Sequence, residues 1–224
     1  MKAFPRLAFS ILIEKVLDFM TQSEVIQSNN ERLVIKRFNT IYSVKWIPAL
    51  ILLRGLYPYS VRPIERVIRE VLFFNYQGVP IVRYWNHRLV VRDYIEGRTP
   101  SPSDFWKVIE YLKRLHKECW RIGDTKWDNF IILDRKRVIL VDAEQAVVDC
   151  SNKSLMADAI VGSFFLYYSD NPELSKLSYQ FFIEIIRDRC EIKYLFHPGI
   201  VVLGLLMPRT YLGVIKYCLR KVKR

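Results

Sequence analysis

Four side chains in the middle of the chain have the types and spacing that phosphoryl transfer requires. Asp124, Lys126 and Asn129 lie at positions i, i+2 and i+5, immediately before an apolar stretch. A polar turn and a second apolar stretch follow, and the latter ends at Asp142. In phosphoryl transfer one carboxylate orients the attacking hydroxyl and a cation neutralises charge on the phosphoryl group, while an amide and a second carboxylate hold Mg²⁺. The segment therefore contains every type of group that this chemistry uses.

The same residues also suit an ordinary β-hairpin, in which Asp, Asn and Lys are common turn residues. The apolar stretches 130–133 and 138–141 predict the two strands of such a hairpin, with a tight polar turn between them. The choice between the two interpretations depends on whether the preceding chain supplies groups that would bind a nucleotide.

A lysine and a glutamate upstream are candidates for such groups. Lys36 lies between apolar neighbours in a predicted strand, 32–38, and Lys45 is a competing candidate in a less strand-like segment. Residues 63–76 begin with a proline and carry apolar side chains at helical spacing, which predicts a helix. Glu70 lies near the middle of this helix, and we expect it to pair with Lys36. An exposed Glu70 that balances nearby arginines is the alternative.

Together these motifs resemble those of the protein-kinase-like superfamily. The interval from Asp124 to Asn129 matches the catalytic loop H-R-D-x-x-x-x-N, and Asp142 stands where kinases carry the metal-binding Asp of D-F-G. The strand with Lys36 is similar to the V-A-I-K strand. The segment 89–97 is similar to the kinase hinge, where backbone groups hold the adenine ring.

The resemblance, which covers roughly residues 31–170, implies binding of ATP and Mg²⁺ and a role for each residue of the site. The implied catalytic residues are Asp124, which orients the acceptor hydroxyl, and Lys126, which stabilises the transferring phosphoryl group. The implied metal ligands are Asn129 and Asp142. The implied ATP-binding residues are Lys36 on the α- and β-phosphates, Glu70 as its ion-pair partner, and Asp93, Tyr94 and Ile95 in the hinge.

Departures from the usual pattern indicate an atypical kinase. No G-x-G-x-x-G precedes Lys36, and such a loop lets backbone N–H groups approach the phosphates. Ile122-Gly123 replaces the usual His-Arg, and the short interval from Asp142 to Asp158 leaves little room for a regulated activation segment. The chain is similar in style to RIO kinases, the kinase of the tRNA-threonylcarbamoylation complex and lipopolysaccharide-core kinases. In such folds a buried helix Asp, here Asp158, braces the catalytic loop.

The resemblance implies an α+β, bilobal fold with a reduced N-terminal β-sheet lobe and a mainly helical C-terminal lobe. We expect these lobes to span residues 1–96 and 97–224, with the boundary at the glycine after the hinge. A helix from about Arg6 to Met20 is expected to pack on the first lobe. Ser103 is expected to cap the helix before the catalytic loop, and His116 on that helix is expected to be structural.

The sequence motifs indicate the ATP-binding groups more clearly than the molecule that carries the acceptor hydroxyl. We expect a Ser or Thr hydroxyl of a protein, and hence an active, atypical serine/threonine kinase. A lipid or sugar kinase is the first alternative, favoured by the short segment after Asp142 and by the apolar stretches 46–53 and 199–207. A non-catalytic pseudokinase that binds a partner, RNA or a membrane surface is the second, favoured by the missing glycine-rich loop.

The bulk composition bears on partners and compartment. The net charge is +12, and basic residues alternate with apolar ones at helical spacing over 211–224, which suits an anionic membrane surface or RNA, or a solvated helix face. The two apolar stretches are shorter than the roughly 20 residues that span a bilayer. With no signal-peptide pattern evident, we expect a cytoplasmic protein that is peripheral at most. The four scattered cysteines argue against a zinc site and against disulfides.

Overall fold

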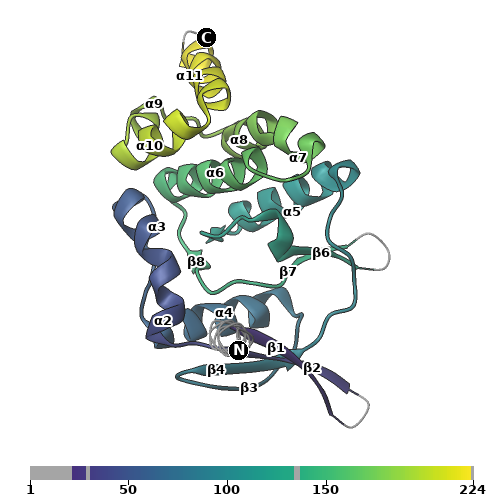
Figure 1. Cartoon of the computed structure of the whole chain (residues 1–224). Helices are drawn as coiled ribbons and strands as arrows, with labels where there is room; N and C mark the ends of the chain where they lie inside the picture. Colours follow the sequence, from purple (N-terminus) through teal and green to yellow (C-terminus); the bar gives the residue numbers. More distant parts are fainter. Residues whose placement is uncertain (1–21, 29–30, 134–136, 223–224) are drawn as a thin grey trace, which may run out of the picture.

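The fold is mixed α+β, with a sheet at one end of the molecule and helices at the other (Figure 1). The computed structural model describes residues 22–28, 31–133 and 137–222. The helix expected from 6 to 20 lies outside these ranges. The sheet consists of β1 (Ser23–Ser28), β2 (Glu31–Arg37), β3 (Val82–Asn86) and β4 (Leu89–Asp93), which are antiparallel and ordered β1-β2-β4-β3. The strands expected around Lys36 and before the hinge are therefore confirmed.

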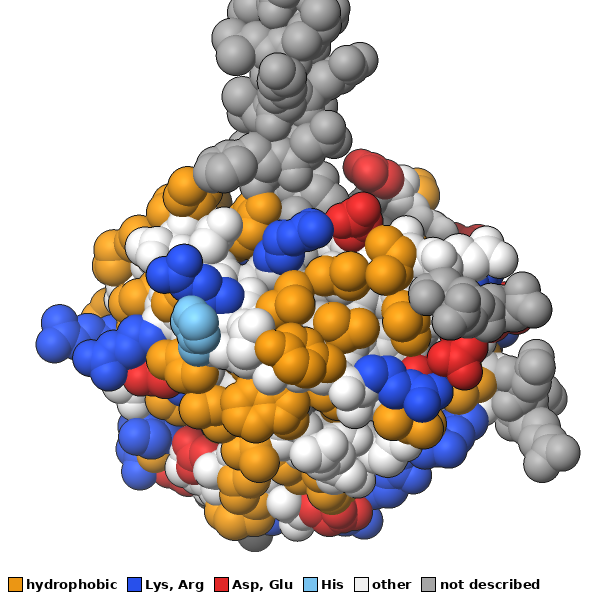
Figure 2. Space-filling view, turned by 90° about the horizontal axis from the view of Figure 1, so that it is seen from below, with side chains coloured by type: hydrophobic (Ala, Val, Ile, Leu, Met, Phe, Trp, Pro, Cys, Tyr) orange, Lys and Arg blue, Asp and Glu red, His pale blue; other side chains and the backbone are white. Residues whose placement is uncertain are grey.

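The two faces of this sheet have different environments. Val34 and Lys36 of β2 are buried on the side of helix α4 (Pro63–Gln77), as the alternation along a strand requires. Leu33 and Ile35 point to the opposite face and are only partly buried. Figure 2, which views the molecule from below, shows apolar side chains gathered on this outward side. Lys36 therefore lies on the inner face of the sheet, toward α4.

Helix α4 confirms the helix expected over 63–76, but its buried face is partly charged. Its first residue is a proline, and it ends at Gly78, whose φ of 78° is the left-handed conformation typical of a helix C-terminus. Val67 and Val71 are buried, whereas three other apolar side chains of the expected stripe remain 39–56% exposed: Ile64, Ile68 and Leu72. Arg66 and Glu70 are fully buried instead because both form ion pairs.

The elements between β2 and α4 are short, and those after β4 are mainly helices. Between β2 and α4 lie α2 (Thr40–Ser43), η1 (Val44–Trp46) and α3 (Ile47–Leu52). The elements between β4 and α6 are η2 (Pro102–Asp104), α5 (Phe105–Lys117), β5 (Trp120–Arg121), η3 (Trp127–Asn129), β6 (Phe130–Ile132), β7 (Val138–Leu140) and β8 (Val147–Val148). The last are α6 (Asn152–Tyr167), α7 (Pro172–Lys176), α8 (Ser178–Ile186), α9 (Ile192–Leu195), α10 (Pro198–Leu206) and α11 (Pro208–Val222).

Helix α5 is capped two residues earlier than the sequence indicated. The first turn is the 3-10 helix η2, and Ser101, rather than Ser103, forms the capping box with Asp104. The Asp104 carboxylate accepts the Ser101 N–H at 3.1 Å and ion-pairs with Arg98 and Lys107, both at 2.6 Å. Both serines suit an N-cap by type, and the Asp three residues after Ser101 decides between them.

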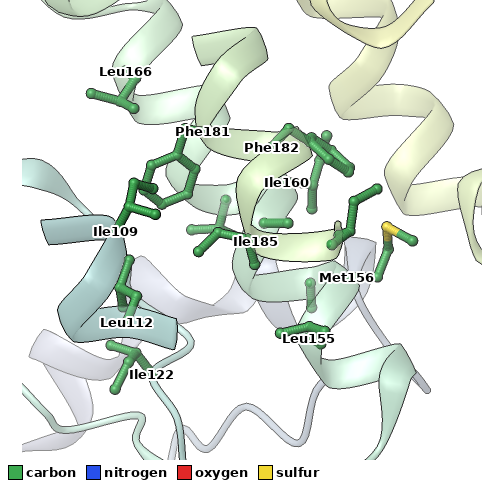
Figure 3. Close-up of a cluster of buried hydrophobic side chains, with 14 of the residues drawn as sticks. Ile109, Leu112, Ile122, Leu155, Met156, Ile160, Leu166, Phe181, Phe182 and Ile185 are labelled. Atoms are coloured by element: carbon green, nitrogen blue, oxygen red, sulfur yellow. The ribbon is translucent and has the colours of Figure 1, made fainter. Parts of the chain in front are cut away.

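The main hydrophobic core lies among the helices that follow the hinge. Figure 3 shows side chains of α5, α6 and α8 meeting there, including Leu112, Ile160 and Phe181, which are at most 1% exposed. Helix α6 is apolar on all sides, as is typical of a helix surrounded by others. It therefore provides a rigid base for the polar side chains that it carries, such as Asp158.

This core does not divide at Gly97. It includes Leu53, Tyr57 and Phe74 from the first half of the chain, while a smaller cluster around Val90 lies between the sheet and α4. Gly97 itself packs closely on β6, since a Cβ there would lie 2.3 Å from a methyl of Ile131. The glycine thus permits a close approach between the two segments.

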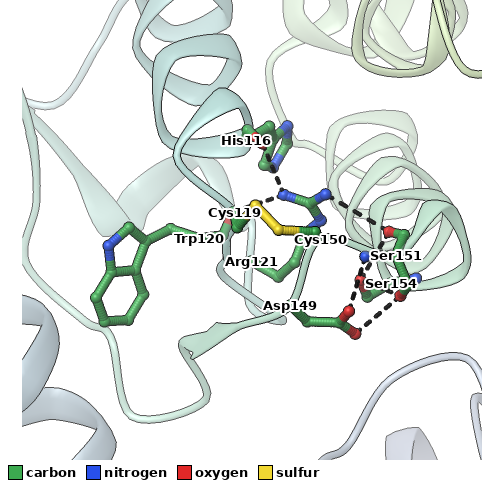
Figure 4. Close-up of a disulfide and its surroundings, with 8 residues drawn as sticks. All are labelled: His116, Cys119, Trp120, Arg121, Asp149, Cys150, Ser151 and Ser154. Carbon is green, nitrogen blue, oxygen red and sulfur yellow. Dashed lines mark hydrogen bonds between the residues drawn. A yellow bond between two sulfur atoms is a disulfide. The ribbon is translucent and has the colours of Figure 1, made fainter.

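Two disulfides correct the expectation drawn from the scattered cysteines. Cys119 pairs with Cys150 beside the start of α6 (Figure 4), and Cys190 pairs with Cys218 of α11, with Cα–Cα distances of 4.5 and 6.0 Å. The partners are 31 and 28 residues apart, and only the folded chain brings them together. Spacing alone cannot reveal such pairs. Disulfides persist in oxidising compartments and in intracellular proteins of hyperthermophiles.

The C-terminal helix α11 follows the expected amphipathic pattern. Tyr211 and Cys218 are buried, whereas Lys216, Arg220 and Lys221 are exposed. Within the described ranges, no helix is both long enough and apolar enough to cross a bilayer.

Candidate active site

A buried carboxylate fixes the loop that carries Asp124. Asp158, on α6, accepts hydrogen bonds from the backbone N–H groups of Ile122 at 2.9 Å and Gly123 at 2.7 Å. Its Oδ2 also lies 3.1 Å from Nε2 of His116, a buried ring whose pKa is lowered by that burial. The structure thus confirms the bracing position expected of Asp158 and the structural position expected of His116.

Two tyrosines from the segment between α3 and α4 hold the same loop from the other side. Gly123 has a φ of 72°, and a Cβ at this position would lie 2.6 Å from the ring of Tyr57. The Tyr57 hydroxyl donates to the carbonyl of Arg121 at 3.0 Å, and the Tyr59 hydroxyl donates to that of Gly123 at 2.6 Å. Sequence reasoning missed both tyrosines because they lie in an upstream loop with no motif of their own.

The hairpin β6–β7 brings Asn129 and Asp142 to the loop. Its register pairs Phe130 with Leu140, and the N–H of Val141 then donates to the carbonyl of Asn129 at 2.9 Å. The side-chain Nδ2 of Asn129 donates to the carbonyl of Asp124 at 3.0 Å. The expected hairpin is therefore present, and it places three predicted residues in one region: Asp124, Asn129 and Asp142.

Burial and the neighbouring Asp142 affect the ionisation of Asp124. Burial and the negative charge of Asp142 raise the pKa of Asp124 to about 7, and a hydrogen bond from Asn129 offsets only part of that rise. A carboxylate that titrates near neutral pH can accept a proton during a reaction and release it afterwards. Both burial and the neighbouring charge therefore favour the protonated form of Asp124.

Lys36 connects the sheet to both α4 and the hairpin. Its Nζ lies 2.6 Å from Oε2 of Glu70 and 2.7 Å from Oδ1 of Asp142. Burial disfavours the charged lysine, but the carboxylates of Asp142, Glu144 and Glu70 outweigh this effect and hold the pKa of Lys36 above its ordinary value. The expected pair of Lys36 and Glu70 is present. Burial raises the pKa of Glu70 to about 7, against the attraction of Lys36.

Glu144 is the main site residue that sequence reasoning missed. This fully buried carboxylate hydrogen-bonds to the Arg66 guanidinium, accepts from Trp46 Nε1 at 2.8 Å and lies 2.8 Å from Nζ of Lys45. Burial alone would raise its pKa, but Lys36, Arg66 and Lys45 together lower that pKa well below the ordinary value. A glutamate two residues after Asp142, where D-F-G has glycine, was the available signal.

Glu70, Asp142 and Glu144 form a group of carboxylates that each have an oxygen within 4.8 Å of the others. The ammonium of Lys36 lies 2.6, 2.7 and 3.5 Å from their oxygens and balances much of their charge. Asp142 is the most open of the three, with 27% of its side chain exposed. A divalent cation would therefore reach Asp142 more readily than the two buried glutamates.

Lys126 does not join the cluster around Lys36. Its side chain is 47% exposed and pairs with Asp128 at 3.7 Å. It remains on the loop two residues after Asp124, at the edge of the region that the other predicted residues occupy.

The hinge residues are placed mainly by backbone contacts. Tyr94 donates its N–H to the carbonyl of Arg32 at 2.9 Å, and Asp93 accepts from Nε of Arg83 at 2.6 Å. Among the described residues, no backbone hydrogen bond uses the N–H of Ile95. The backbone of Tyr94 and the side chain of Asp93 are therefore both engaged with neighbouring residues.

No family model matches this sequence, and no curated protein matches it significantly.

Proposed function

We propose that the protein transfers the γ-phosphoryl group of ATP to a hydroxyl in a Mg²⁺-dependent reaction. The observation that carries this proposal is the position of Lys36, whose buried ammonium joins Glu70 of α4 to Asp142 at the end of the hairpin. A lysine and an aspartate used in this way serve the phosphates and the metal in kinase-like sites. Asp124 lies in the same region, with a pKa raised to about 7.

The proposed reaction uses each group once. The acceptor hydroxyl donates a hydrogen bond to the carboxylate of Asp124, and its oxygen attacks the γ-phosphorus as the bond to the β-phosphate oxygen breaks. The proton passes to Asp124, and ADP leaves. Lys36 binds the α- and β-phosphates, and Glu70 keeps it in position. Lys126 stabilises the transferring group after it leaves its exposed pair with Asp128, an exchange that costs little at the surface.

The residues present fit Mg²⁺. This ion prefers oxygen ligands and retains several waters, and Asp142 offers a partly exposed carboxylate next to Val141, whose N–H donates to the backbone carbonyl of Asn129. The raised pKa of Asp124 also reflects the charge of Asp142, which a cation would offset. When bound, Mg²⁺ would neutralise charge on the β- and γ-phosphates.

We also infer a kinase-like, bilobal arrangement. The small hydrophobic cluster between the sheet and α4 would belong to the first lobe, and the large core would belong mainly to the second, with Leu53, Tyr57 and Phe74 joining it from the first half of the chain. The site residues come from both, because Lys36 and Glu70 precede Gly97 while Asp124 and Asp142 follow it. The nucleotide would bind between the two parts, with its adenine at the hinge.

Phosphoryl transfer from γ-labelled ATP tests this function. The unaltered protein is expected to transfer label to a hydroxyl substrate, or slowly to water, only with Mg²⁺. Asp124→Asn should lower the rate by about 10²–10⁴-fold, the usual contribution of a general base. Asp170→Asn alters an exposed aspartate outside the site and serves as the control. Equal rates in the two variants would contradict the assignment.

A further inference from the structure

A mostly apolar cavity of about 310 Å³ lies beside the proposed catalytic loop. Its walls come from α3, α6 and α10, which bring together the apolar stretches 46–53 and 199–207. Gly123 forms part of the wall, so the cavity reaches the residue next to Asp124. A molecule in this space would therefore lie against the loop that carries the proposed base.

The side chains that line the cavity restrict which molecules it can bind. Leu52, Phe164 and Leu203 contribute apolar side chains from the three helices. A water molecule takes up about 30 Å³, and a methylene group is of similar size. The cavity volume therefore has room for roughly ten methylene groups. A sugar would leave its hydroxyls without partners along such a wall, at a substantial desolvation cost. A hydrocarbon chain would not.

The wall combines apolar side chains with two polar groups. Phe165 and Leu206 line the cavity while remaining 37% and 49% exposed, so the cavity opens to solvent past apolar side chains. Lys45, whose side chain is 47% exposed and lies 2.8 Å from Glu144, and the backbone at Gly123 also belong to the wall. This lining suits an amphiphile, because it offers apolar side chains to a hydrocarbon chain and polar groups to a hydroxyl.

We propose that this cavity binds the chain of a lipid alcohol and that the hydroxyl of this lipid is the phosphoryl acceptor. The inference rests on the proposed phosphotransferase function and specifies its substrate class. The lipid hydroxyl oxygen forms the new bond to the γ-phosphorus, the bond to ADP breaks, and the hydroxyl proton passes to Asp124. The products are a lipid phosphate monoester and ADP.

Binding of a lipid alcohol can be measured separately from phosphoryl transfer in the Asp124→Asn protein. Trp46 lines the cavity, so its fluorescence should change when a lipid alcohol binds. Dioctanoylglycerol and dibutanoylglycerol carry the same hydroxyl and differ only in chain length. Burial of each additional methylene should improve affinity by up to about fourfold, since it contributes about 0.8 kcal/mol. The longer lipid is thus expected to bind at least about tenfold more tightly.

Two variants that fill the cavity and one matched control identify the binding site. Leu206→Trp and Ala49→Phe introduce bulk from α10 and α3, and each should remove the advantage of the longer chain. Leu205→Trp changes the adjacent residue, which is 69% exposed and does not line the cavity, and should retain that advantage. Circular dichroism of each variant shows whether it is folded.

The outcomes distinguish the two proposals. Label transfer from ATP to dioctanoylglycerol, weakened by the filling variants and retained in the control, would support both. Transfer to a peptide or sugar hydroxyl, with no dependence on lipid chain length, would overturn the lipid acceptor and leave the phosphotransferase function standing. Equal lipid affinity in Leu206→Trp and Leu205→Trp would also overturn it. Lipid binding without transfer to any acceptor would contradict both.

Discussion

At the scale of residues, the site is a network of ion pairs between mostly buried side chains. Lys36 is surrounded by carboxylates, and Glu144 is surrounded by Lys36, Lys45 and Arg66. Removing one member of such a buried network leaves its partners uncompensated, at a cost of about 3–5 kcal/mol. The network therefore holds Lys36 and Asp142 in fixed positions before any ligand binds.

Asp124 is expected to make stability depend on pH. Its pKa is about 7 in the folded protein, against 3.8 for an ordinary aspartate, so between these values the folded state binds more protons than the unfolded state. Stability from this group is complete below the lower pKa and is lost as pH rises through 7. Asp124→Asn should therefore have a higher melting temperature than the unaltered protein at pH 8, and little or no advantage at pH 4.

Thermal unfolding of both proteins from pH 4 to 8 measures this difference. The comparison isolates Asp124 because the other titrating groups, including Glu70, are common to both. A constant difference in melting temperature across the range would contradict the raised pKa.

At the scale of elements, the backbones of α3 and α10 are in direct contact at one point. A Cβ on Gly199, in α10, would lie 1.6 Å from the carbonyl oxygen of Leu52, in α3. Since backbone cannot yield as a side chain can, this contact fixes the distance between the two helices. The same two helices form walls of the cavity beside Asp124.

Gly199→Ala is therefore expected to destabilise the protein by at least about 1–3 kcal/mol, the usual cost of overpacking. Gly213→Ala in α11 is the matched control, because its Cβ would meet only the ring of Tyr179, which is 40% exposed and free to move. Alanine also favours a helix over glycine at both positions. Urea denaturation compares the two, and a Gly199→Ala protein as stable as the control would refute the close contact.

Some features of these elements could be predicted from the sequence, and others could not. Hydrophobic periodicity was sufficient for α4 and for the hairpin β6–β7, whose boundaries follow apolar and turn residues. Periodicity did not reveal that Arg66 lies on the buried face of α4, because burial of Arg66 and Glu70 depends on partners far along the chain. For the same reason the sequence indicated Lys36 and Asp142 as site residues but did not reveal Glu144.

At the scale of the whole molecule, the two disulfides close loops that the sequence did not indicate. A bond that closes a loop of about 30 residues stabilises a fold by about 2–4 kcal/mol, chiefly by restricting the unfolded chain. Reduction is thus expected to lower the melting temperature by several degrees. Unfolding with and without a reductant measures this, with thiol titration as the control. An unchanged melting temperature after complete reduction would contradict the disulfides as stabilising links.

Binding of ATP with Mg²⁺ is the most direct test of the central claim, which is that Lys36, Asp142 and Asn129 form a nucleotide–metal site. A ligand that binds only the folded state raises the melting temperature as its concentration rises, by about 2.7 kcal/mol of stability at 100 times its Kd. We expect this shift with ATP and Mg²⁺ together, a smaller one with ATP alone, and none with Asp142→Ala. A Mg²⁺-independent shift, or an equal shift in Asp142→Ala, would contradict the account.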